Sequence, residues 1–306
     1  MDTMEKHVLL YLKDCKHQKC LDQKTLKAYQ IDLNQFLEFA SNTMPSDVTP
    51  DMLEDFIANL HEKYKPKSAK RKIASIKAFF HYLEFKDVIN LNPFNKIRIH
   101  FREPELLPKT IPLEDLQNFL ATIQRQCQTA PTNYRRRNAI RDLAVFELLF
   151  ATGMRISELC SLKPLDINLS NGILLIHGKG NKERRLQIGT PQVLEELLRY
   201  HENFKTEIES CNHFFVNQSS RPLSDQTIRR MLNKYSSMAA MELHVTPHMF
   251  RHTFATSLLE ADVDIRYIQE MLGHSSINIT EIYTHVAVSK QRDILATKHP
   301  RNHFNI

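Results

Sequence analysis

The sequence has few glycines, no paired cysteines and no long uninterrupted hydrophobic run. Six glycines in 306 residues, together with apolar residues at three- and four-residue spacing, favour a predominantly helical protein. The most apolar stretch, residues 143–151, is short and is interrupted by Glu147, and residues 1–14 carry charges within their apolar pattern. These features predict neither a membrane span nor a signal peptide.

The five cysteines are an odd number and lack the CxxC spacing of a zinc site or the density of a disulfide scaffold. They are Cys15, Cys20, Cys127, Cys160 and Cys211. We interpret them as reduced thiols of a cytoplasmic protein.

The charge balance favours a polyanionic partner. Lys and Arg number 41 against 35 Asp and Glu, which gives a net charge of +6 and a pI near 9.0. Such an excess is typical of proteins that bind nucleic acid, although composition alone does not separate DNA from RNA or acidic lipid.

The pattern along the chain predicts two domains. Four helices are expected in the first part, over 4–20, 25–41, 50–62 and 67–85. Three prolines in FREPELLPKTIP indicate an extended linker over 101–112. The part that follows is expected to have helices near 113–127 and 138–151, strands at 173–177 and 184–188, then further helices. The fold class is therefore mainly α with a small β-sheet (α+β), with domains over 1–100 and 113–306.

Two basic clusters are candidates for binding DNA phosphates. The first carries seven cations against one acid within 62–77, namely Lys63, Lys65, Lys67, Lys70, Arg71, Lys72 and Lys77. The second, weaker cluster consists of Arg135, Arg136 and Arg137, with Arg125 nearby. Neutralising phosphates releases condensed counterions, so such clusters supply salt-sensitive affinity. The plainer alternative is a solvated helix face.

A helix beginning at Thr246-Pro247 places two functional side chains together. His248 falls in its first turn and Arg251 three residues on, so both share one face, apart from an apolar stripe of Phe250, Phe254 and Leu258. A helix N-terminus favours phosphate, and a guanidinium can bind two of its oxygens. His248 and His252 could instead hold a metal, but no HExxH glutamate accompanies them, and we interpret His252 as structural.

Other candidates each have a structural alternative. Arg155 opens a short helix after Gly153, and Glu158 can hold its guanidinium, as an ordinary salt bridge would. Lys179 lies at a hairpin tip between two glycines, where a Lys is most often merely solvated. Asp264 can cap a helix that Gly273 ends, which leaves His274 just beyond it. Tyr283 follows nine residues later; a lone tyrosine is usually a packing residue.

Together these residues resemble the signature of the tyrosine recombinases, closest to the Xer and phage-integrase group. The matching strings are TGMRISELCSL, GKGNKERRLQI, TPHMFRHTFATSLLEADVDIRYIQEMLGHSSINITEIYTHV and the ending KHPR, and the likeness covers nearly the whole chain. It implies a helical core-binding (SAM-like) domain followed by a tyrosine-recombinase catalytic domain. One departure is the connection between the first two catalytic-domain helices, about Ala121 to Asn138, which is longer than expected for housekeeping Xer proteins.

The resemblance implies a mechanism without metal or other cofactor. Tyr283 would be the nucleophile that forms a 3′-phosphotyrosyl link, while Arg155 and Arg251 hold the non-bridging phosphate oxygens. His274 would add a hydrogen bond, His248 would accept the proton, and Lys179 would donate one to the leaving 5′-oxygen.

The implied partner is double-stranded DNA with paired recombination sites, bound by a tetramer of this chain or with a related recombinase, with accessory proteins possible. The tail Ala287–Ile306 would dock on a neighbouring subunit or pack on its own domain. Two other functions stay open, a type IB topoisomerase and a DNA-binding regulator without chemistry. The regulator would require a replaced catalytic position, and none of the six is replaced.

Overall fold

The structure is a computed structural model that describes residues 3–41, 43–99, 108–178 and 183–273. Its contacts divide the chain into two compact units, Met1–Glu105 and Leu106–Ile306. Within the described ranges, no helix combines the length and the apolar character needed to cross a membrane.

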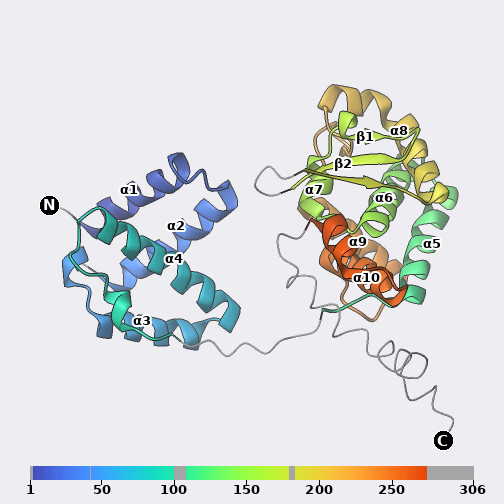
Figure 1. The fold of residues 1–306 in the computed structure, drawn as a ribbon. Coiled ribbons are helices and arrows are strands. Elements are labelled where there is room, and N and C mark those ends of the chain that lie inside the picture. The colour runs from blue at the N-terminus through green and yellow to red at the C-terminus, as the bar shows by residue number, and fades with distance from the viewer. Residues whose placement is uncertain (1–2, 42, 100–107, 179–182, 274–306) are drawn as a thin grey trace, which may run out of the picture. The chain divides into compact units, whose positions relative to one another are not determined.

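The first unit is built from four helices (Figure 1), which are α1 (Met4–His17), α2 (Gln23–Phe39), α3 (Pro50–Lys63) and α4 (Pro66–Phe85). Thr3, Asp22 and Thr49 each accept a hydrogen bond from a backbone N–H in the first turn, which fixes where α1, α2 and α3 begin. Short 3₁₀ turns at Pro45–Asp47 and Pro93–Lys96 complete the unit. Its core is rich in aromatic rings, including Tyr11, Phe36, Phe79 and Phe80.

The second unit combines helices with a small sheet. In chain order its elements are α5 (Leu113–Thr129), α6 (Asn133–Thr152), α7 (Ile156–Ser161), β1 (Ile167–Asn168), β2 (Ile173–His177), β3 (Glu183–Gln187), α8 (Pro191–Cys211), α9 (Asp225–Met238), α10 (Pro247–Glu260) and α11 (Ile265–Leu272). The strands are antiparallel in the order β1-β2-β3, and Leu175 of β2 lies opposite Arg185 of β3.

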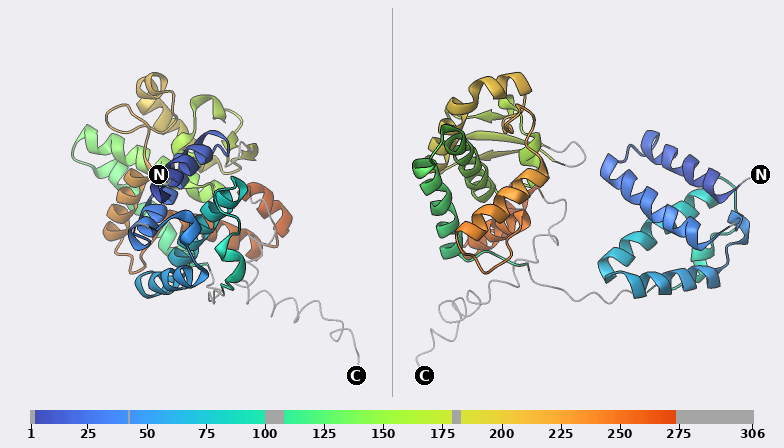
Figure 2. Two further views of the ribbon diagram at one scale, coloured as in Figure 1. Left: turned by 90° about the vertical axis from the view of Figure 1, so that its left-hand side faces the viewer. Right: turned by 180° about the vertical axis from the view of Figure 1, so that it is seen from behind.

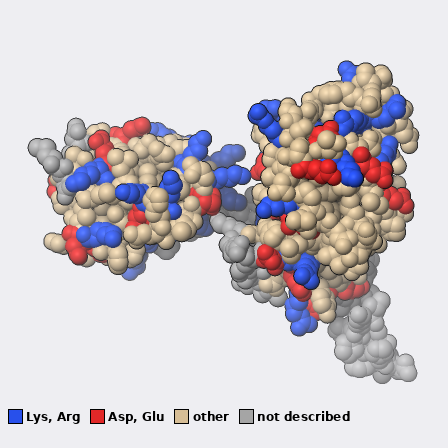
Figure 3. Space-filling view, turned by 90° about the horizontal axis from the view of Figure 1, so that it is seen from above, with Lys and Arg blue, Asp and Glu red and all other residues tan. Residues whose placement is uncertain are grey.

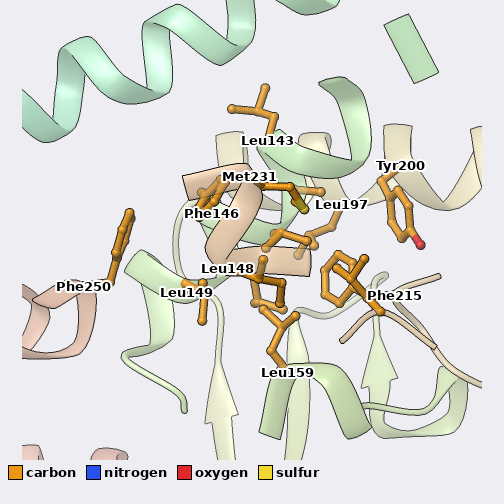
Figure 4. Packing of buried hydrophobic residues seen from close by; sticks show 14 of the residues in the cluster. Leu143, Phe146, Leu148, Leu149, Leu159, Leu197, Tyr200, Phe215, Met231 and Phe250 are labelled. Carbon is orange, nitrogen blue, oxygen red and sulfur yellow. The ribbon is translucent and has the colours of Figure 1, made fainter. Parts of the chain in front are cut away.

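Helix α6 is the centre of this unit. An unbroken run of buried residues extends from Ala139 to Phe146, because α5, α8 and α10 all pack against this one helix. Figure 2 shows α9 and α10 in orange beside the green helices α5 and α6. Figure 4 shows Phe146 and Leu149 of α6 among Leu197, Met231 and Phe250 from later helices. The long helix therefore supplies the rigid base from which the site is built.

The predicted fold class is confirmed, with one error in the connections. The connection expected over about 121–138 is only residues 130–132, since α5 continues to Thr129 and α6 begins at Asn133. Helix α6 begins early because the Thr132 hydroxyl accepts a hydrogen bond from the Arg135 backbone N–H at 3.2 Å. The arginine cluster 135–137 thus lies on the first turn of a helix and not on a loop. The ends of the other predicted helices and strands differ by up to three residues, as frayed helix ends do.

Candidate active site

Arg155 lies at the junction between α6 and α7. Gly153 ends α6 in the left-handed conformation (φ 58°), and an added Cβ there would lie 2.5 Å from the Phe254 ring, so glycine is required. The Arg155 backbone N–H and its Nη1 then each donate to the Glu158 carboxylate at 2.8 Å. The expected Arg155–Glu158 pair is present, and it leaves the Arg155 side chain 37% exposed.

Glu158 also holds a second arginine that the sequence pattern did not single out. Arg184 of β3 donates to the Glu158 carboxylate at 2.7 and 3.2 Å, and its Nε donates to the Met271 carbonyl of α11 at 2.8 Å. Burial alone would raise the pKa of the Glu158 carboxyl, but the hydrogen bonds and charges of Arg184 and Arg155 outweigh burial and hold that pKa below its usual range. Glu158 is therefore an anion that orients two guanidinium groups.

Arg251 ties together the ends of two helices. Its Nη1 donates to the Gly153 carbonyl at 2.8 Å, and its Nη2 donates to the Leu272 carbonyl at 2.7 Å. Arg251 is only 5% exposed and projects from the first turns of α10. It consequently fixes the chain two residues before Arg155 and the residue that ends α11.

His248 and His252 lie one turn apart on α10 but in different surroundings. Pro247 is the first residue of α10, and His248 beside it is exposed. His252 is half-buried, and burial, His248 and Arg251 together lower its pKa to about 4, so its ring is neutral at physiological pH. In the described ranges, no third His, Cys, Asp or Glu joins this pair to make a metal-binding cluster.

Three of the six candidate catalytic residues, Lys179, His274 and Tyr283, lie outside the described residues. The elements that precede two of them are described. Strand β2 ends at His177, and the N-cap of α11 is Asp264, whose carboxylate accepts from the Arg266 backbone N–H at 2.8 Å. Gly273, in the left-handed conformation (φ 64°), ends α11 as the sequence predicted.

The described residues of the site gather where α6 and α11 end and where α7 and α10 begin. Arg155 at the start of α7, Arg251 on α10 and the last residues of α11 are joined through hydrogen bonds to Gly153, Glu158 and Arg184. Residues 98 positions apart along the chain meet in the Arg251–Gly153 contact. Guanidinium groups held by carbonyls and one carboxylate, next to a helix N-terminus, are suited to binding an oxyanion.

Only part of the basic stretch of the first unit is exposed. The prediction that Lys72 binds DNA is wrong, because this side chain is buried. Lys72 is 5% exposed, and its ammonium donates to Asp32 at 3.1 Å and to Gln35 at 2.6 Å, so it stabilises the contact between α2 and α4 and does not face DNA. Arg71 also pairs with Asp32. The remaining cations of the stretch have exposed side chains, namely Lys63, Lys65, Lys67, Lys70 and Lys77.

The second basic cluster also contains both exposed arginines and one arginine that is paired with a carboxylate. The prediction that Arg137 binds DNA is corrected. Its guanidinium donates to the Glu207 carboxylate at 2.6 Å and lies 4.4 Å from the centre of the Phe204 ring, so it joins α6 to α8. Arg135 and Arg136 are exposed. Sequence spacing did not distinguish these roles, because the partners are 66 to 70 positions away.

Comparison with known families accounts for both units. The profile of the Phage integrase family matches residues 111–290, and that of the Phage integrase N-terminal SAM-like domain matches residues 8–86. A protein of Agathobacter rectalis named tyrosine recombinase is 63% identical over 305 residues, which cover 100% of each chain. Tyrosine recombinase XerD of Halalkalibacterium halodurans is 33% identical over 308 residues, covering 98% of this chain and 100% of that one.

Solved structures share the fold. XerH bound to a palindromic difH substrate, in a post-cleavage complex, matches with a TM-score of 0.76 at 23% identity over 93% of this chain and 83% of that one. XerA recombinase matches with a TM-score of 0.53 at 25% identity over 97% and 99%. These structures support the fold described above.

Proposed function

The chain belongs to the phage integrase family and is a tyrosine recombinase, and we propose that it cuts and rejoins DNA at paired sites through a 3′-phosphotyrosyl link at Tyr283. The observation that carries the proposal is the meeting of Arg155 and Arg251 at one junction. Arg251 donates to the carbonyl of Gly153, two residues before Arg155. Two guanidinium groups at one place can balance the charge that develops on a phosphate during cleavage.

In the proposed cleavage step the Tyr283 oxygen attacks the scissile phosphorus and the bond from phosphorus to the 5′-oxygen breaks. His248 takes the phenol proton, and Lys179 gives a proton to the leaving 5′-oxygen. Arg155 and Arg251 hold the non-bridging oxygens, with a further hydrogen bond from His274. The products are a 3′-phosphotyrosyl link and a free 5′-hydroxyl, and attack by the 5′-hydroxyl of another strand reverses the step without an energy source.

The assembly that we propose contains four subunits on two DNA sites and passes through a Holliday junction. A λ integrase tetramer bound to a Holliday junction is among the solved structures of this fold. The four subunits are copies of this chain or pairs with a related recombinase, and we place the reaction in the cytoplasm, where reduced thiols such as the five free cysteines are usual. The tail Ala287–Ile306 is then the segment proposed to dock on a neighbouring subunit.

The nucleophile is tested with Tyr283→Phe on a nicked duplex that traps the cleaved complex. The target site is first located by footprinting the full chain on the DNA that flanks its gene. We expect the variant to form no SDS-stable DNA adduct while binding the site as the parent does, because only the attacking oxygen is lost. Tyr267→Phe is the matched control, since Tyr267 is 63% exposed on α11, and it should form adducts normally. An adduct from the Tyr283 variant would refute the assignment.

The arginine pair is tested with Arg155→Ala and Arg251→Ala on the same substrate. Each should lose about 3 kcal/mol or more of transition-state stabilisation, seen as a fall in the cleavage rate constant. Arg185→Ala is the control, because Arg185 is an exposed arginine of β3 next to Arg184. Unchanged cleavage by either variant would remove that arginine from the mechanism.

A further inference from the structure

The second unit contains a cavity of about 530 Å³ that is distinct from the junction described above. It lies between the end of α5, the first turns of α6 and one side of α9. Its lining includes Tyr134, Arg135, Arg141, Arg230, Lys234 and Tyr235. Its volume falls within the range of small-molecule sites, about 300 to 1,000 Å³.

The charges that line the cavity do not balance. Four of the lining residues are cationic and only one, Asp142, is acidic. Asp142 is already satisfied, since its Oδ1 accepts from Arg141 at 2.6 and 3.0 Å and its Oδ2 accepts from the Tyr235 hydroxyl at 2.9 Å. Burial and the Asp142 charge raise the pKa of Tyr235 well above its usual range, so the phenol keeps the proton that it donates.

Arg135 and Arg230 carry the positive charge that is left over. Both are exposed, and neither has an acidic partner in the part of the chain that the structure describes. Two other arginines of α6 do have acidic partners, since Arg137 pairs with Glu207 and Arg141 with Asp142. Lys234 adds a third cation, and its ammonium approaches the Tyr235 hydroxyl at 3.1 Å. Cations that face one cavity repel each other, and a bound anion relieves that repulsion.

Arg135, which lines the cavity, and the catalytic junction are separated by almost the whole length of α6. Arg135 lies in the first turn of α6, whereas Gly153 follows its last residue. At 1.5 Å per residue, the helix places these two points roughly 25 Å apart. One phosphate cannot occupy both places, so an anion in the cavity is not the scissile group.

We infer that this cavity is a second phosphate-binding site, in which Arg135 and Arg230 are the principal ligands. Guanidinium groups bind phosphate oxygens in pairs, and the exposed Tyr134 ring at the edge offers a surface on which a base can stack. The phosphates come either from DNA backbone outside the cleavage point or from a free nucleotide. The DNA source rests on the proposed function, whereas binding of a free phosphate compound does not.

The test compares two double variants of the full chain. Arg135→Gln with Arg230→Gln removes the two ligands. Lys205→Gln with Arg229→Gln removes the same charge from exposed positions that do not line the cavity. Two binding measurements are made on each: calorimetry with inorganic triphosphate and with ATP, and the salt dependence of binding to a duplex without a recombination site. Thermal unfolding checks the fold of each variant, and if the cavity pair unfolds, Arg230→Gln alone is used.

The cavity variant should weaken triphosphate binding at least tenfold or should lower the slope of log affinity against log salt by about 2, with the control nearer the parent. A loss confined to the slope identifies DNA backbone as the source, and a loss confined to triphosphate or ATP identifies a free compound. Equal losses in both double variants, or no loss in either, would overturn the inference. If Tyr283→Phe still formed adducts, the proposed function would fail while the triphosphate measurement kept its meaning.

Discussion

At the scale of single residues, Glu158 links the two halves of the site. Its carboxylate accepts from Arg155 on one side and from Arg184 on the other, and Arg184 in turn reaches the Met271 carbonyl. A buried carboxylate with two guanidinium partners cannot lose its charge without leaving both misplaced. Arg184 is accordingly a positioning residue between the strand β3 and the end of α11. In the sequence, His274 is only two positions after Leu272, the last residue of α11.

We predict that Glu158→Gln lowers both stability and cleavage. Removing the shared anion should cost about 3 kcal/mol of unfolding free energy and slow DNA cleavage by roughly 100-fold, because Arg155 loses the partner that orients it. Urea unfolding and the trapped-adduct assay measure the two effects. Glu202→Gln, an exposed change on α8, should alter neither.

The stability effect of this substitution should also depend on pH. The folded state lowers the Glu158 pKa below its ordinary 4.5, so its charge stabilises the fold above about pH 4.5 and the benefit disappears as the pH falls through the lower folded value. The difference between parent and variant should therefore shrink in acid. A difference that stayed constant down to about pH 3 would mean that the carboxylate charge is not the cause.

At the scale of elements, a carboxyl group with a raised pKa lies on α6 close to α8. Glu147 interrupts the most apolar stretch of the sequence and is carried into the packing of these two helices. Burial, together with Glu196 of α8, raises the pKa of Glu147 to about 7. The folded protein therefore binds a proton at this position that the unfolded chain does not bind near pH 6.

We predict that Glu147→Gln stabilises the protein at alkaline pH. Because the folded pKa is raised, stability falls as the pH rises from about 4.5 through about 7, and the amide avoids this cost. The gain should be about 2 to 3 kcal/mol near pH 8 and should vanish near pH 4. Chemical denaturation across this range tests it, with the exposed Glu195→Gln as control. A variant less stable than the parent near pH 8 would contradict the assignment.

Helices α2 and α4 are joined by a different buried charge. Asp32 is 1% exposed and accepts from Arg71, Lys72 and the Ser75 hydroxyl. We predict that Asp32→Asn destabilises the first unit by about 3 to 5 kcal/mol, since Lys72 is left buried without its anion. Thermal unfolding measures the loss, and Glu38→Gln on the exposed side of α2 serves as control. A loss below about 1 kcal/mol would show that water reaches Lys72.

At the scale of the whole molecule, the chain has separate hydrophobic cores and a dispersed surface charge. The buried residues described for the core of the first unit run from Met4 to Phe94, and those of the large core of the second unit begin at Ile111. On each unit as drawn in Figure 3, Lys and Arg side chains are interspersed with acidic ones. The net charge of +6 is thus a weak guide to where DNA binds.

We predict that residues 1–100, expressed alone, fold into a helical domain that unfolds in one cooperative transition. The reason is that this segment contains every member of its own core. Circular dichroism and thermal unfolding test it. Phe80→Ala, at a side chain with no exposed surface, should cost about 3 to 5 kcal/mol and abolish the transition. A fragment without cooperative unfolding would show that the first unit depends on the second.

The sequence by itself determined the features that depend on neighbours along the chain. The N-cap Asp264, the helix stops Gly153 and Gly273, and the Arg155–Glu158 pair follow from spacings of one to four residues, where backbone geometry leaves few choices. The placing of His248 and Arg251 on the first turns of one helix belongs to the same class.

Only the tertiary structure decided which charges are buried and by what they are held. Arg184 meets Glu158 across 26 positions, Lys72 meets Asp32 across 40, and Arg251 meets Gly153 across 98. The residues next to a lysine or arginine in the sequence do not reveal whether its side chain faces water or pairs with a buried carboxylate. The difference arises from desolvation, which acts on a side chain only once distant segments have packed around it.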